Sequence, residues 1–136
     1  MARDYIENSK IILEEALEAF RKGVYNRVIR LSQESVELAL KGMLRLIGIE
    51  YPKVHDVSDV LNENRDRFPS KYRSEIDYLI EASTWLTEKR GVAMYGDERK
   101  GIPPSKLFTY DDAKKALEYA NKVYQIVELL FKKYHR

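Results

Sequence analysis

The chain has 136 residues, of which 44% are hydrophobic and 34% are charged, and its formal net charge is +2. This composition supports a folded core and excludes a disordered chain, and no apolar run is long enough to span a membrane. Residues 1–7 are charged and contain no apolar signal-peptide segment, so we expect a cytoplasmic protein with a single domain over residues 1–136.

Cysteine and histidine usage limits the chemistry. The chain has no cysteine, which excludes disulfides, thiolate metal sites and a cysteine nucleophile. Its two histidines, His55 and His135, are far apart in sequence, so we expect neither a metal site nor a cofactor. His135 is the penultimate residue, and we expect it to be frayed.

Positive charge is concentrated at the C-terminal end. Residues 101–136 carry a net charge of +3, whereas the rest of the chain carries −1. A solvated helix face explains this concentration most simply, and a phosphate-binding surface is the alternative.

Apolar residues recur at helical spacing along the whole chain. They predict a first helix over residues 3–22, ended by Gly23, and a second over residues 24–47, ended by Gly48. A short helix over residues 56–64 and a helix from Ser70 to about residue 90 follow. The last helix begins at Thr109, because Thr109 and Asp112 have the spacing of a capping box.

This pattern predicts an all-α fold, an antiparallel up-and-down bundle of four to five helices, because no segment shows strand alternation between hairpin turns. The apolar stripes of the second and last helices are wide for a small bundle. Wide stripes indicate a homodimer, although they also occur in well-buried helices of monomers.

The segment from Arg90 to Asp97 is the first candidate site. Arg90 continues the apolar seam of its helix, where a charge is unfavourable unless it is paired or faces a cleft. Gly91 and Gly96 favour a departure from regular helix, and Tyr95 precedes a polar run. Either these residues form a cleft that holds phosphate or a base, or Arg90 pairs with a carboxylate at a helix end. The preceding members of the seam are Tyr72, Ile76, Leu79, Ser83 and Leu86.

Two further features have a structural explanation that we favour. His55 precedes a short helix, and we expect it to cap or pack there by bonding the backbone of the turn. Polar residues on the second helix can pair with one another at helical spacing, as a surface or interface stripe. These residues are Glu34, Glu37, Lys41 and Arg45.

Taken in order, these residues resemble the HEPN family (higher eukaryotes and prokaryotes nucleotide-binding). Residues 30–44 are similar to the family pattern of Gln, Ala-x-Glu and Leu-Lys-x-Leu, with Val36 where Ala is common. Residues 48–57 are similar to its turn of Gly followed by Pro-x-x-His-Asp-Leu. Tyr25 after Gly23 and the Thr-Tyr-Asp-Asp-Ala start of the last helix also fit, so the resemblance covers nearly the whole chain.

The resemblance implies a bundle of four or five helices that usually dimerises, with a cleft between protomers lined by the second helix and the end of the fourth. It also implies a nucleotidyltransferase partner, commonly in a toxin–antitoxin pair. Many family members are metal-independent ribonucleases that carry Arg, a polar residue and then His.

The sequence departs from that ribonuclease motif. Arg90 matches its arginine, but Gly91 replaces the polar residue, Tyr95 stands where His is expected, and Asp97 stands where toxins place Tyr. Tyrosine is a poor base at neutral pH, so we expect no catalytic residue here. The prediction is a non-catalytic nucleotide- or RNA-binding homodimer that uses Arg90, Tyr95, Asp97 and Lys41 and has a nucleotidyltransferase partner. The alternatives are a ribonuclease toxin using Arg90 with Tyr95, or with His55 brought in by folding, and a purely structural helical adaptor.

Overall fold

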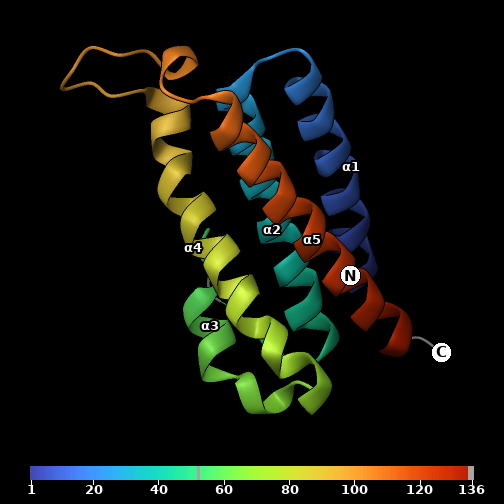
Figure 1. Cartoon of the computed structure of the whole chain (residues 1–136). Coiled ribbons are helices and arrows are strands. Elements are labelled where there is room, and N and C mark those ends of the chain that lie inside the picture. Colours follow the sequence, from blue (N-terminus) through green and yellow to red (C-terminus); the bar gives the residue numbers. More distant parts are fainter. Residues whose placement is uncertain (52, 135–136) are drawn as a thin grey trace.

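The computed structural model describes residues 1–51 and 53–134, so the predictions for Pro52 and His135 lie outside the described residues. Four long helices lie side by side in alternating directions, and the short α3 packs against α4 (Figure 1). This arrangement confirms the predicted all-α bundle. The α-helices are α1 (Ala2–Arg21), α2 (Tyr25–Leu46), α3 (Ser58–Glu63), α4 (Arg73–Tyr95) and α5 (Tyr110–Tyr134), and the short 3-10 helices are η1 (Arg65–Arg67), η2 (Ser70–Tyr72) and η3 (Pro104–Lys106).

Helix α2 lies at the centre of the bundle and packs against α1, α4 and α5. The wide apolar stripe predicted for this helix is therefore covered within the chain itself. The stripe is not available to a second copy, so the predicted homodimer would have to use another surface. The buried residues of the stripe include Val28, Leu31, Val36, Ala39, Leu40 and Met43.

Small and polar residues bring α1 and α2 close together. The buried Ser9 and Ser35 hydroxyls each donate to the other residue's carbonyl oxygen at 2.8 Å. Further along α2, a Cβ atom at Gly42 would lie 2.9 Å from Ile6 Cγ1 and 3.1 Å from Tyr5 Cβ. A side chain at residue 42 would therefore force the two helices apart.

The predicted helix ends are largely confirmed. Gly23 has a φ of 74° and follows α1, as a left-handed cap requires. At the start of α5 the Thr109 backbone N–H donates to Asp112 Oδ2 at 2.9 Å, and the Asp112 N–H donates to Thr109 Oγ1 at 3.2 Å. These two bonds form the reciprocal capping box that the sequence predicts.

Helix α4 differs from its prediction at both ends. A 3-10 turn occupies Ser70–Tyr72 before the helix begins, and the helix continues through Gly91 to Tyr95. One glycine costs a helix only about 1 kcal/mol, and burial of Ala93 on the last turns offsets that cost. The chain leaves the helix at Gly96, and the loop that follows projects from the end of the bundle (Figure 1). None of the described helices has the length and apolar character needed to cross a membrane.

Candidate functional site

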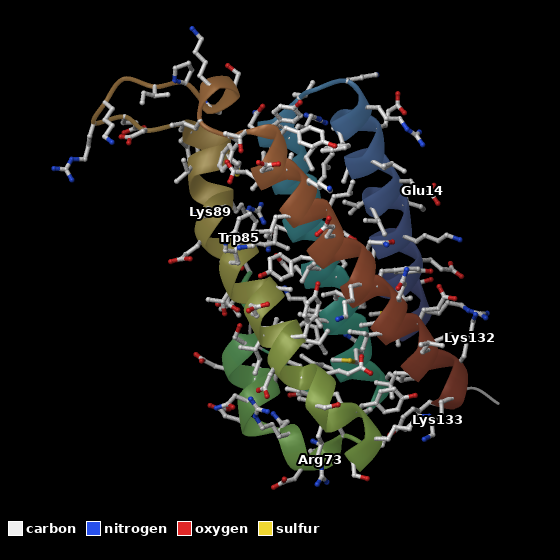
Figure 2. The ribbon with its side chains drawn as sticks, in the orientation of Figure 1. Glu14, Arg73, Trp85, Lys89, Lys132 and Lys133 are labelled. Atoms are coloured by element: carbon white, nitrogen blue, oxygen red, sulfur yellow. The ribbon has the colours of Figure 1, made fainter. Side chains whose placement is uncertain are left out.

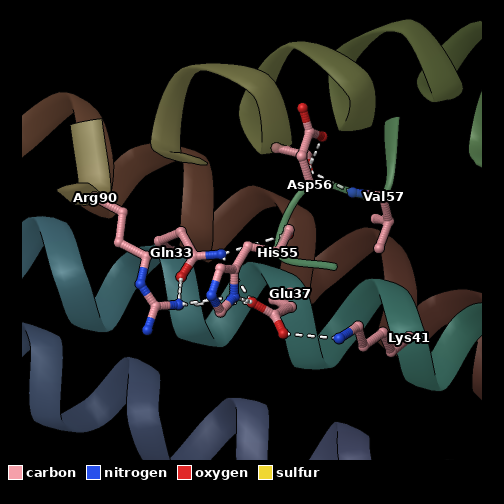
Figure 3. Close-up of polar contacts among 8 residues, drawn as sticks. Gln33, Glu37, Lys41, His55, Asp56, Val57 and Arg90 are labelled. Carbon is pink, nitrogen blue, oxygen red and sulfur yellow. Dashed lines mark hydrogen bonds and ion pairs between the residues drawn. The ribbon is translucent and has the colours of Figure 1, made fainter. Parts of the chain in front are cut away.

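A cluster of polar side chains joins α2, α4 and the loop before α3 (Figure 3). Helix α2 contributes Gln33, Glu37 and Lys41, which lie four residues apart and so share one face of the helix. Arg90 comes from α4 and His55 from the loop. We refer to these five residues as the polar cluster.

Arg90 points from α4 toward α2. Its Nη1 donates to Gln33 Oε1 at 2.6 Å and lies 3.7 Å from Glu37 Oε1. The Arg90 side chain is only 18% exposed, so its charge lies at the edge of the core. That charge is also paired, because Gln33 and Glu37 lie beside it. The predicted pairing of Arg90 with a carboxylate is therefore present, and the predicted cleft for a phosphate or a base stays a prediction.

A second set of hydrogen bonds holds the loop of His55 against α4. Asp56 Oδ1 accepts from Ser83 Oγ at 2.8 Å and from the Ser58 backbone N–H at 3.0 Å. The Val57 N–H donates to Ser83 Oγ at 3.3 Å. These bonds explain why a serine occupies an otherwise apolar seam, because Ser83 anchors the loop that presents His55.

Glu37 lies at the centre of the polar cluster. Its Oε1 accepts from Gln33 Nε2 at 3.0 Å, and its Oε2 accepts from Lys41 Nζ at 2.8 Å. Burial acts to raise the pKa of Glu37, but the hydrogen bonds from Lys41, Gln33 and His55 outweigh it, and the pKa lies below the usual value. Glu37 is therefore a carboxylate at neutral pH.

The hydrogen-bond pattern defines how His55 is used. Its Nδ1 lies 2.7 Å from Glu37 Oε1 and 3.1 Å from Arg90 Nη1. A carboxylate can only accept and a guanidinium can only donate, so the shorter contact places a proton on Nδ1, donated to Glu37. Nε2 is then left for another partner. The imidazole contacts Glu37 rather than the turn backbone, which corrects the bonding expected from sequence.

The cluster carries excess positive charge. The single carboxylate of Glu37 faces two cationic side chains, Arg90 and Lys41, together with the imidazole of His55. Arg30 lies one turn before Gln33 on the same side of α2, and its Nε is buried without a hydrogen-bond partner among the described residues. An anion is the chemical species that such an arrangement attracts.

Tyr95 and Asp97 lie apart from this cluster. Tyr95 follows Arg90 by five residues on one continuous helix, which turns it about 140° away. Its side chain is 68% exposed, and together with Asp97 it lines a shallow depression at the end of α4. The Asp97 carboxylate accepts from the Lys100 N–H at 3.2 Å. The structure thus joins Arg90 and Lys41 through Glu37, while a ligand role for Tyr95 and Asp97 stays a prediction.

Three members of the cluster were absent from the predicted site: Gln33, Glu37 and His55. The polar stripe on α2 contained Glu37, and the Pro-x-x-His-Asp turn contained His55, but neither pattern indicates which elements meet. Among the described residues, no group of three His, Cys, Asp or Glu side chains is placed to hold a metal ion.

The fold agrees with comparisons to known proteins. A family model described as "HEPN domain" matches residues 2–130, and the chain belongs to this family. TT1696 from Thermus thermophilus is 27% identical with a TM-score of 0.78, over 93% of this chain and 95% of that one. ST0689, described as an archaeal HEPN homologue, is 24% identical with a TM-score of 0.70, over 94% and 95% of the two chains, and shows the shared fold. Curated protein sequences give no significant match.

Proposed function

We propose that this HEPN protein binds the phosphate group of a nucleotide or RNA at the polar cluster, without cleaving it. The observation that carries this proposal is the sharing of one carboxylate, Glu37, among Arg90, Lys41 and His55. The remaining positive charge is available to an anionic ligand.

The geometry of Arg90 suits this role. All of its described contacts in the cluster use Nη1, which leaves Nη2 and Nε to donate to phosphate oxygens in a bidentate arrangement. The imidazole of His55 is 56% exposed, whereas Lys41 is only 12% exposed. A ligand therefore approaches over His55 and meets cations that have already lost much of their hydration.

Titration calorimetry with 5′-AMP tests the proposal. Arg90→Ala should weaken binding by about 1–3 kcal/mol, the range of a hydrogen bond to a charged group. Arg73→Ala is the matched control, because Arg73 lies at the opposite end of the same helix (Figure 2). An Arg90→Ala variant that binds like the parent but melts much lower would make Arg90 a structural ion-pair partner and refute the site.

A ribonuclease is the second candidate, and the contact between His55 and Arg90 favours it. Glu37 holds Nδ1 of His55, so Nε2 can act as the base that removes a 2′-hydroxyl proton, while Arg90 holds the phosphate. Digestion of RNA in the presence of a chelator separates the two candidates. Cleavage that His55→Asn abolishes would establish the second candidate, and intact RNA would leave the binding function.

We also propose a homodimer, on the outer face of α1 and α5. A groove of about 540 Å³ between these helices is lined largely by apolar side chains and by pairs of opposite charge. A second copy would cover it, because lysines and glutamates on both sides can pair across a two-fold axis. The apolar residues are Leu13, Leu17, Phe20, Tyr110, Leu117 and Tyr124, and the charged ones are Lys10, Glu14, Lys114 and Glu118.

Family membership alone supports the last part of the proposal, a nucleotidyltransferase partner in a toxin–antitoxin-like pair. Co-expression with a nucleotidyltransferase encoded next to this chain tests it. A complex that survives size-exclusion chromatography would support the partnership, and separate elution of the two proteins would refute it.

A further inference from the structure

Aromatic side chains fill the seam between α4 and α5, on a different side of α4 from the polar cluster. The ring of Tyr119 from α5 lies 5.6 Å from that of Tyr78 and 5.7 Å from that of Trp85, both from α4, between ring centroids. Tyr119 is buried, whereas Tyr78 and Trp85 are half-buried and keep part of their surface in solvent. The seam therefore presents two partly open aromatic rings about seven residues, or about 10 Å, apart along α4.

Lysine side chains lie over these rings. Lys122 Nζ is 4.2 Å from the centroid of Tyr78, and Lys115 Nζ is 4.8 Å from that of Trp85. Lys89 lies 5.8 Å from the same tryptophan, next to which it appears in Figure 2. At the far end of the seam, Lys71 and Lys133 lie 5.4 and 5.5 Å from the centroid of Tyr72.

These five lysines contact aromatic rings. Among the described residues, none of them has a carboxylate within ion-pairing distance. On α1, by contrast, Arg3 pairs with Glu7, and Arg21 with Glu18. Within the seam itself, Glu81 forms a hydrogen bond with the Tyr119 hydroxyl and not with a lysine.

We propose that the seam between α4 and α5 is a binding track for single-stranded RNA. The lysine ammonium groups would move from the ring faces to the phosphates, and bases would stack on the exposed parts of Trp85 and Tyr78. Stacking on aromatic rings within a positively charged groove is how proteins bind single strands with little sequence preference. From Lys115 to Lys133 the track is about 27 Å long, enough for several nucleotides.

This track goes beyond the phosphate site proposed above, and it does not depend on that site. Trp85 and Arg90 are five residues apart on α4 and point about 140° away from each other. An acidic peptide would satisfy the lysines but would not use the rings. Because the partly exposed rings and the unpaired lysines occur together, RNA fits the seam better than a peptide.

Trp85 provides the readout, because it is the only tryptophan in the chain. Titration with a 12-nucleotide oligouridine should quench its fluorescence through base stacking. The triple variant Lys115→Gln, Lys122→Gln, Lys133→Gln should bind at least about tenfold more weakly at 0.1 M salt. The slope of its log K against log salt concentration should be smaller in magnitude than the parent's by about 2, because three phosphate contacts are lost. The control variant Lys22→Gln, Lys100→Gln, Lys106→Gln makes the same change in net charge at exposed sites outside the seam and outside the groove between α1 and α5, and should bind like the parent.

Two further titrations decide the outcome. Polyglutamate should bind weakly and leave the fluorescence unchanged, and equal quenching by polyglutamate or by anionic phospholipid vesicles would overturn the assignment to RNA. Equal loss of binding in both triple variants would also overturn it, because net charge alone would then explain the affinity. Arg90→Ala should leave the oligouridine quenching intact, so failure of the track and failure of the phosphate site give different results.

Discussion

At the scale of single residues, Glu37 organises the candidate site. Its two oxygens accept from Lys41 on one side and from Gln33 and His55 on the other, and Arg90 lies beside them. The carboxylate fixes the positions of two cations, Lys41 and Arg90, that would otherwise repel each other. In the proposed function, Glu37 would hold these cations in place for a ligand, as well as stabilise the fold.

We predict that Glu37→Gln lowers the free energy of unfolding by about 1.5–3 kcal/mol at pH 7, because Lys41 and Arg90 lose their shared counter-ion. The pKa of Glu37 is lowered in the folded protein, so its contribution to stability is fully present above the usual value of 4.5 and is lost as the pH falls through the folded-state value. Urea unfolding of both proteins from pH 7 to pH 3.5 measures this. The difference between them should shrink below pH 4.5, and a difference independent of pH would contradict the assignment.

Sequence reasoning identified Arg90 but not its partners. A charge on an apolar seam requires a counter-charge or a cleft, and that argument holds without a structure. The identity of the partner depends on how α2 and α4 pack, and on the loop that Asp56 and Ser83 anchor, which are long-range contacts that local patterns do not encode. For this reason the sequence predicts only a capping or packing role for His55.

At the scale of helices, local signals predicted most boundaries and failed at the end of α4. The capping box of Thr109 and Asp112 and the glycine after α1 are local devices, and the structure contains both. The helix passes through Gly91 because burial of Ala93 against the rest of the protein stabilises the last turns. Helix propensity describes single residues and does not include this contribution. The continued helix then separates Tyr95 from Arg90.

The two glycines inside helices should respond to alanine in opposite ways. Gly42→Ala should destabilise the protein by about 1–3 kcal/mol, because the new Cβ meets Ile6 and Tyr5. Gly91→Ala is the matched control, since a Cβ there meets nothing within 4 Å, and it should stabilise by about 0.5–1 kcal/mol. Denaturant unfolding of both variants measures the contrast. Stabilisation by both substitutions would show that α1 and α2 are not in close contact at Gly42.

At the scale of the whole molecule, the central position of α2 changes the account of self-association. The apolar stripe of α2 is used within the chain, so a second copy can only meet apolar surface elsewhere, and the groove between α1 and α5 offers it. In Figure 1, α1 lies on the right of the bundle and α5 runs beside it in front, and the two helices contact each other.

Light scattering should therefore give about twice the chain mass of 16.0 kDa at micromolar concentration. Leu17→Lys, inside the groove, should shift the protein to the monomer, because the charge would be buried against apolar surface. Leu129→Lys is the control, since Leu129 is 62% exposed and does not line the groove. A parent mass of 16.0 kDa would end the dimer proposal.

The measurement that tests the central claim most directly is an NMR titration of the labelled protein with 5′-AMP and with inorganic phosphate. Binding at the polar cluster should shift the Arg90 Nε–H signal, the His55 ring signals and the Gln33 side-chain amide together, along one saturation curve for each ligand. Signals near Tyr95 and on the seam between α4 and α5 should change little. If saturating nucleotide leaves the Arg90 and His55 signals in place, or moves only signals elsewhere, the polar cluster is a structural ion-pair network and not a ligand site.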